Sequence, residues 1–233
     1  MKNYFVFDKL NTLDYQIYAA NKNRFEGGGK VVEVVKIPGR NGTLSIEDGS
    51  FENVPIIYSM YCSKEIIPNI SAMRSMLGAT SGYKRLEDSF DPDYYMRGRY
   101  VDKFTVSLSD RKNAAFQVRF DCDPRRFLKS GDRAKTFTAG ATLRNPTLYD
   151  ALPMIRAYGT GYFIISGVRV NITTANEYTD IDCELQEAYK GSTNCNGNIT
   201  LVNGEFPKLV PGSNAIEISG ITRLDITARY WTI

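Results

Sequence analysis

The side chains that most often perform catalysis or bind metal ions are scarce in this chain. Its 233 residues include no histidine. This excludes Ser-His-Asp and Cys-His nucleophilic catalysis, HExxH metalloproteases and nearly all catalytic zinc sites, because each needs an imidazole. The four cysteines show no C-x-x-C spacing: Cys62, Cys122, Cys183 and Cys195. The sequence therefore predicts isolated buried thiols instead of a zinc site or a redox pair.

One segment, residues 85–100, is rich in acidic residues, which are the side chains that a glycosidase or a calcium site would use. It contains four carboxylates within a few residues: Glu87, Asp88, Asp91 and Asp93. A glycosidase needs two carboxylates that flank a sugar. However, Pro92 and the crowding of the acids favour a turn, with Tyr94 and Tyr95 opening the next strand. The segment also lacks the D-x-D-x-D-G pattern of a calcium loop.

Two glycine-rich stretches could cradle a phosphate, but neither has the required context. The GGGK stretch at 27–30 precedes an expected strand instead of following one. The Gly159-Thr160-Gly161 stretch lacks a third glycine and a following helix. The sequence therefore predicts no catalytic residue, no metal and no cofactor, and the protein is not expected to be an enzyme.

The charge and hydropathy of the chain indicate a protein that is dedicated neither to nucleic acid nor to a membrane. The formal net charge is only +3, whereas a nucleic-acid-binding domain usually carries a strongly basic face. Basic residues are in excess between Arg119 and Lys135, where mixed signs favour a solvated loop over a phosphate-binding patch. No apolar run approaches the roughly 20 residues that span a bilayer, and the chain reaches Asp8 too early for a secretory signal. We expect synthesis in the cytoplasm and no membrane contact.

Alternating apolar residues predict a β-hairpin over residues 101–122. Two sets of residues each share one face of a strand: Phe104, Val106 and Leu108, and then Phe116, Val118, Phe120 and Cys122. The SDRKN stretch between them has the composition of a turn.

Further strands are expected in the second half of the chain. Residues 161–173 and 178–189 are predicted to form a second hairpin with three inward residues: Ile181, Cys183 and Leu185. Alternation near the end places four residues on one face: Leu224, Ile226, Ala228 and Tyr230.

A single helix is predicted over approximately residues 66–77. Ile66, Ile70, Met73 and Leu77 have helical spacing, and Gly78 provides a stop. Small residues and prolines mark a connector at residues 136–153. We therefore expect a mainly β protein with an N-terminal β domain at 1–138 that carries the short helix, and a second β domain at 139–233. Whether the last strand returns to the first domain stays open.

The most distinctive local feature is a loop that surrounds one arginine. Between a valine-rich run and Thr43 the chain reads KIPGRNG. Asn41-Gly42 is expected to supply the positive φ angles of a tight hairpin turn, while Pro38 stiffens its entry. The loop would then hold Arg40 outward, able to grip a carboxylate or carbonyl of a neighbouring chain. The alternative is that Arg40 bonds its own turn.

Several stretches, in order, resemble the siphophage distal tail (Dit) family. They are VVKIPGRNGTLSIEDGSFENVPIIY near the N-terminus, then NPTLYDALPMIRAYGTGYFIISG, DIDCELQEAY and GEFPKLVPGSNAIEISG. Together they extend over most of the chain. Thr147 departs from the pattern, since a glycine often follows Asn-Pro in the family.

The resemblance implies a structural protein of the virion, at the tail tip of a long non-contractile-tailed phage or prophage. Members form a hexameric ring between the tail tube and the tail-associated, baseplate or receptor-binding proteins, and DNA passes through as cargo. It also implies that the second domain is a galectin-like β-sandwich. We expect Arg40, Asn41, Gly42, Tyr94 and Tyr95 to lie at the assembly interface.

The alternative function is a carbohydrate-binding module that recognises host cell-wall polysaccharide. Galectin-like sandwiches can bind sugars, and sugar sites usually stack a ring on an exposed aromatic side chain. The single tryptophan, Trp231, is expected in the last strand.

Overall fold

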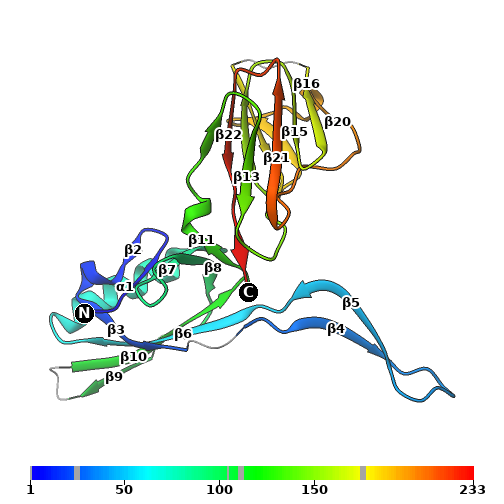
Figure 1. Cartoon of the computed structure of the whole chain (residues 1–233). Helices are drawn as coiled ribbons and strands as arrows, with labels where there is room; N and C mark the ends of the chain where they lie inside the picture. Colours follow the sequence, from blue (N-terminus) through cyan, green and yellow to red (C-terminus); the bar gives the residue numbers. More distant parts are fainter. Residues whose placement is uncertain (1, 24–26, 104, 110–112, 174–176) are drawn as a thin grey trace. The chain divides into compact units, whose positions relative to one another are not determined.

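The chain is mainly β with one α-helix, as the sequence predicted, and it divides into two compact units. The computed structural model describes residues 2–23, 27–103, 105–109, 113–173 and 177–233. The first unit comprises Met1–Arg126 with Ile233, and the second comprises Phe127–Thr232 (Figure 1). The chain therefore returns to the first unit at Ile233. In the second unit, β12 (Lys135–Phe137) pairs with β22 (Arg223–Thr227).

The first unit is built around one curved antiparallel sheet. Its hydrogen-bonded strand order is β2-β1-β7-β8-β10-β6-β3, and β9 lies beside β10. A separate two-stranded sheet consists of β4 and β5. The strands are β1 (Phe5–Phe7), β2 (Leu10–Asn11), β3 (Ile17–Lys22), β4 (Lys30–Val35), β5 (Leu44–Phe51), β6 (Val54–Cys62), β7 (Lys84–Asp88), β8 (Tyr94–Tyr100), β9 (Val106–Ser109) and β10 (Asn113–Cys122).

The core of the first unit follows the alternation read from the sequence. Phe116, Val118, Phe120 and Cys122 of β10 are buried, whereas the residues between them face outward. Strands β9 and β10 pair as the expected hairpin. Phe104 and the turn residues 110–112 lie outside the described residues. Aromatic rings fill the centre of this core: Phe5 and Tyr58 lie with their ring centroids 4.9 Å apart, and Phe120 meets Phe5 edge-on.

The expected helix is confirmed as α1 (Ile66–Ala79). Ile70, Met73 and Leu77 are buried, which is the stripe that the spacing predicted. The helix continues past Gly78 and ends where Thr80 adopts an extended conformation. The opposite side is solvated, since Ile67 is 74% exposed.

The second unit is a β-sandwich of two antiparallel sheets, with most of its buried apolar residues in a single cluster. One sheet has the order β12-β22-β14-β17-β18-β19, and the other has the order β13-β21-β15-β16-β20. The other strands of these two sheets are β13 (Ala141–Asn145), β14 (Met154–Tyr158), β15 (Gly161–Ile165), β16 (Val168–Ile172), β17 (Tyr178–Asp182), β18 (Glu187–Lys190), β19 (Thr193–Asn194), β20 (Ile199–Leu201) and β21 (Gly212–Ser219). Strands β11 (Arg126–Leu128) and β23 (Trp231–Thr232) lie outside the two sheets and pair with each other.

The predicted hairpin between residues 161–173 and 178–189 is wrong. Each half forms a hairpin of its own, β15 with β16 and β17 with β18, and the two hairpins belong to different sheets. Ile181 and Cys183 are buried as expected, but Leu185 is 63% exposed. The reason is local: Asp182 accepts the backbone N–H groups of Glu184 and Leu185, so the chain turns and the alternation ends there.

The last part of the second unit is held by a buried ion pair. Leu224, Ile226, Ala228 and Tyr230 are buried, as the alternation predicted. Between the last two, Arg229 adopts a left-handed conformation with φ of 53°. Its guanidinium binds both carboxylate oxygens of Asp182, at 2.7 and 2.9 Å. Burial raises the pKa of the Asp182 carboxyl, but hydrogen bonds from Arg229 outweigh this and hold the pKa below its usual value.

We expect the substitution Arg229→Ala to lower the free energy of unfolding of the second unit by about 3–5 kcal/mol, because it leaves a buried carboxylate unpaired. A carboxyl whose pKa is lowered by folding stabilises the folded state at pH values above its pKa in the unfolded chain, which is about 3.9. This stabilisation is lost as the pH falls through the pKa of the carboxyl in the folded protein. Urea unfolding at neutral and acidic pH measures both effects. The difference between the wild type and Arg229→Ala should shrink in acid.

Two further variants separate the ion pair from the backbone strain. Arg229→Gly should cost about 1 kcal/mol less than Arg229→Ala, because glycine adopts the left-handed conformation without strain. Lys208→Ala removes the exposed pair with Asp150 and should cost less than about 1 kcal/mol. Equal losses for Arg229→Ala and Lys208→Ala would contradict the role given to the buried pair.

Candidate functional site

The loop that carries Arg40 connects β4 and β5, but its turn differs from the prediction. The backbone N–H of Arg40 donates to the carbonyl of Ile37 at 3.2 Å. Pro38 and Gly39 are therefore the central residues, and Gly39 has φ of 79°, as a type II turn requires. Gly42 has the expected positive φ, of 83°, but Asn41 does not, so the expected tight turn with positive φ at both Asn41 and Gly42 is wrong. The Pro-Gly pair supplies the rigidity instead.

The predicted interface residues Arg40, Asn41 and Gly42 are all exposed in this loop. Among the described residues, the Arg40 guanidinium has no ion-pair or hydrogen-bond partner. The loop therefore presents a planar cationic donor to solvent, at the end of a stiff turn.

The hairpin that leads to this loop exposes an unusual amount of apolar surface. Nearly every residue of β4 and β5 is exposed, and six large apolar side chains on the hairpin and its loop are at least 39% exposed: Val31, Val32, Val34, Ile37, Leu44 and Ile46. We call residues 30–51 the arm (Figure 1). An exposed two-stranded apolar ribbon has little means of stabilising itself and invites association, so it is typical of an interaction surface.

Both faces of the arm are apolar. Cross-strand partners share a face, and successive residues alternate between faces. Val34 lies opposite Ser45, and Ile46 lies opposite Glu33, so Val34 and Ile46 belong to opposite faces. They are 58% and 49% exposed. One flat partner surface cannot cover both side chains, which favours insertion of the arm between two surfaces.

The two other predicted interface residues, Tyr94 and Tyr95, open β8 and are partly covered by arginines of the same unit. The Arg126 guanidinium lies 4.4 Å from the Tyr94 ring centroid, and the Arg85 guanidinium lies 3.7 Å from that of Tyr95. Tyr94 is partly exposed, but Tyr95 is only 8% exposed. Tyr95 can therefore contribute little surface to a partner.

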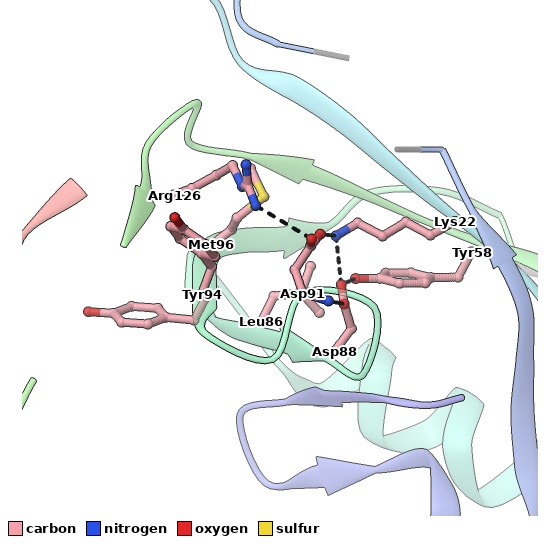
Figure 2. Close-up of a pocket in the computed structure, with 9 residues that line it drawn as sticks. Lys22, Tyr58, Leu86, Asp88, Asp91, Tyr94, Met96 and Arg126 are labelled. Carbon is pink, nitrogen blue, oxygen red and sulfur yellow. Dashed lines mark hydrogen bonds and ion pairs between the residues drawn. The ribbon is translucent and has the colours of Figure 1, made fainter. Parts of the chain in front are cut away.

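The acid-rich segment forms a turn, and its carboxylates bind a lysine that sequence reasoning did not single out. The Nζ of Lys22 lies 2.8 Å from Oδ2 of Asp88 and 2.8 Å from Oδ2 of Asp91. Tyr58 donates from its hydroxyl to the same oxygen of Asp88, at 2.6 Å. Figure 2 shows the Lys22 and Tyr58 side chains meeting at Asp88. We call Lys22, Tyr58, Asp88 and Asp91 the buried polar cluster.

The buried polar cluster is well shielded from water. The Lys22 and Asp88 side chains are 8% and 5% exposed, whereas Asp91 is 38% exposed. The cavity beside them measures about 10 Å³, which is space for about one water molecule. Burial, followed by the nearby Asp88 charge, raises the pKa of Tyr58 well above its usual value, so its hydroxyl keeps its proton. No small-molecule substrate fits in this cavity.

Other candidates for chemistry fail on their geometry. All four cysteines are buried and free, and burial raises the pKa of the Cys122 thiol to about 12, which makes it unreactive. No group of three metal-ligating side chains occurs in the described ranges. Within the same ranges, no helix combines the length and the apolar character of a membrane span.

The carbohydrate-binding alternative gains no support from Trp231. Its Nε1 donates to the carbonyl of Asp150 at 2.9 Å, and its ring stacks on Tyr149 with the centroids 4.3 Å apart. One ring face and the polar edge are therefore already used by the chain itself.

Comparison with known proteins identifies the fold. No protein-family model matches the chain, and no curated protein matches its sequence. Among solved structures, the crystal structure of the Dit protein (gp 19.1) of phage SPP1 aligns over 100% of both chains with a TM-score of 0.76 and 13% identity. It is described as a paradigm of the hub adsorption apparatus in phages that infect Gram-positive bacteria. Chains of the phage P2 baseplate in its activated conformation, with calcium or strontium, align over 97% of both chains, with 9% identity and TM-scores of 0.56 and 0.54. The chain thus has the Dit fold. This confirms the resemblance that was predicted from the sequence.

Proposed function

We propose that this chain is a distal tail protein: a structural hub at the tail tip of a long-tailed phage, in which copies close into a hexameric ring. The ring would connect the tail tube to the baseplate or receptor-binding proteins and let DNA pass. Two observations support the proposal. The SPP1 Dit protein shares the fold over its whole length, and the arm exposes apolar residues on both faces.

The arm carries this proposal because it needs a partner. Permanent oligomers bury on the order of 2,000 Å² or more at each interface, with apolar residues at the centre. A head-to-tail ring uses two different patches on every subunit. The arm is one such patch, and its two apolar faces fit a position between neighbouring proteins of the assembly. Arg40 then lies at the tip of the arm, where a carboxylate or backbone carbonyl of the neighbour can accept a hydrogen bond from its guanidinium.

Negative-stain microscopy and mass photometry of the purified full chain test the ring directly. We expect closed rings with a central hole and a mass that is a multiple of 26.2 kDa. A mass of one subunit at every concentration, together with no association with tail proteins, would contradict the proposal.

We expect the substitution Arg40→Ala to weaken assembly while leaving the fold intact. The guanidinium has no partner among the described residues, so its removal should change the free energy of unfolding by less than about 0.5 kcal/mol. A lost charge-assisted hydrogen bond across an interface costs about 1.5–3 kcal/mol, or roughly a tenfold to hundredfold weaker association. Sedimentation velocity over a concentration series measures the shift.

The control for this variant is Lys208→Ala, which removes an exposed cation from the second unit. It should leave association unchanged. Unchanged association of Arg40→Ala with itself and with the tail tube would remove Arg40 from the interface.

A further inference from the structure

The buried polar cluster has the geometry of a reaction centre. Besides the small cavity next to Asp88, its Lys22 and Asp91 also line an open hollow of about 460 Å³. Lys22 is the last residue of β3 and pairs in register with Tyr58 of β6, so both side chains point to the same side of the sheet. Asp88 ends β7. Strands β3 and β7 are not neighbours in the sheet, so the Lys22 side chain spans the interior to reach Asp88.

The two oxygens of Asp88 have different surroundings. Oδ1 accepts the backbone N–H groups of Phe90 and Asp91, both at 2.9 Å. Oδ2 accepts one hydrogen bond from Nζ of Lys22, at 2.8 Å, and another from the Tyr58 hydroxyl, at 2.6 Å. Two backbone donors on one oxygen form an arrangement that stabilises a developing oxyanion. The other oxygen has a proton donor at hydrogen-bond distance, as a leaving oxygen needs.

We propose that Lys22 and Asp88 react to form an intramolecular isopeptide bond. A bond forms between Nζ of Lys22 and Cγ of Asp88, and the bond from Cγ to Oδ2 breaks. Of the three protons on the Lys22 ammonium, one stays on the nitrogen as the amide N–H and the other two are lost. Oδ2 leaves with those two protons as water, so the reaction balances without an oxidant or a co-reactant. Asp91 takes up the first proton and later returns it to the leaving oxygen, while the second proton passes from the Lys22 nitrogen to Oδ2, which lies 2.8 Å away. The Tyr58 hydroxyl donates a hydrogen bond to the same oxygen.

The surroundings favour this reaction over a permanent ion pair. Attack on Cγ needs the neutral amine, which forms when the ammonium gives up one proton to a base that touches it. Asp91 touches the Lys22 nitrogen, at 2.8 Å, so it can accept the first proton and hold it until the leaving oxygen takes it up. The fold holds amine and carboxyl in contact, which replaces a bimolecular encounter. Exclusion of bulk water then protects the amide from hydrolysis.

The bond would fasten β3, an edge strand of the main sheet, to the end of β7. Like a disulfide, it would constrain the unfolded chain, here between residues 22 and 88. A covalent tie of this kind resists mechanical opening of the first unit, and it does so in a monomer or in an oligomer. The inference therefore stands independently of the proposed ring.

Mass spectrometry of the purified, denatured full chain tests the proposal. We expect an intact mass that is lower than the sequence mass by one water molecule. After trypsin digestion, the peptide containing Lys22 should be joined to the peptide containing Asp88, with no cleavage after Lys22. A full sequence mass after prolonged warm incubation of the folded protein would overturn the proposal and leave an ordinary buried ion pair.

The control variant is Lys22→Arg, which keeps the positive charge but is not expected to form the amide. It should fold, as judged by circular dichroism, and keep its full mass. A succinimide also loses one water molecule, and Asp48-Gly49 is a typical place for it, so the peptide map must find that peptide unmodified. Loss of water in Lys22→Arg, or at Asp48, would contradict the assignment to Lys22 and Asp88.

A second variant, Asp91→Asn, tests the proton acceptor without removing either reacting group. It should slow bond formation about 10²-fold or more, the usual contribution of a general base, while Lys22 and Asp88 remain in contact. Time-resolved intact mass after refolding measures the rate. A rate equal to that of the wild type would remove Asp91 from the reaction. If Lys22→Arg does not fold, this variant and the peptide map still decide the proposal.

Discussion

Replacing Val34 or Ile46 by aspartate is expected to give a folded chain that no longer forms rings. Each side chain is about half exposed in the isolated chain, so the substitution should hardly change the stability of the fold. In the assembly, the loss of a buried aliphatic side chain and the burial of a charge together cost at least about 3 kcal/mol. That corresponds to more than a hundredfold weaker association at each contact.

The two substitutions also test how the arm binds, because Val34 and Ile46 lie on opposite faces. If the arm is inserted between two surfaces, each single variant should abolish rings in mass photometry. Leu185→Asp is the control, since Leu185 is somewhat more exposed than Val34 and Ile46, at 63%, but lies outside the arm. This variant should assemble normally. Normal rings from both arm variants would show that the arm is not an assembly interface.

Replacing Gly161 by alanine is expected to unfold most of the second unit under mild conditions. Gly161 opens β15 with φ of 141°, a conformation that side chains rarely adopt. A Cβ there would lie 2.2 Å from the carbonyl oxygen of Ser219 and 2.8 Å from the Cα of Gly220. Because both atoms belong to the backbone, β15 and β21 must separate at this end. We expect a loss of at least about 4 kcal/mol in the free energy of unfolding, among the largest effects of a single substitution.

Gly167→Ala is the matched control for this variant. Gly167 lies in the turn between β15 and β16, with φ of 84° and open space around the position of a Cβ. Alanine there suffers only the backbone strain of about 1 kcal/mol. Urea denaturation of both variants measures the difference. Similar losses would mean that strain alone, and not the close approach to Ser219, makes glycine necessary at position 161.

The sequence predicted those elements whose pattern is local. The spacing of Ile70, Met73 and Leu77 identified the helix, and the alternation from Phe116 to Cys122 identified a strand with one buried face. These predictions hold because helix and strand periodicities place residues on a face regardless of what covers it. The turn composition of the acidic segment likewise gave the start of β8 at Tyr94.

Predictions failed where a pairing partner had to be chosen. Residues 161–173 and 178–189 both alternate, but alternation does not say which strands pair. Gly167 provides a turn inside the first segment, so β15 pairs with β16 instead. In the arm, the presence of Asn41-Gly42 suggested a two-residue turn, whereas Pro38-Gly39 forms the turn that the structure contains.

By itself, the sequence determined that this is a mainly β protein without histidine-based chemistry, and that its ordered motifs resemble one phage family. Composition and local periodicity are sufficient for such conclusions because they depend on neighbours along the chain. Only the tertiary structure decided that the arm stands exposed on both faces, and that Lys22 meets Asp88 in the interior. Those contacts join residues far apart in the sequence, and no local pattern specifies which distant side chains the folded sheet brings together.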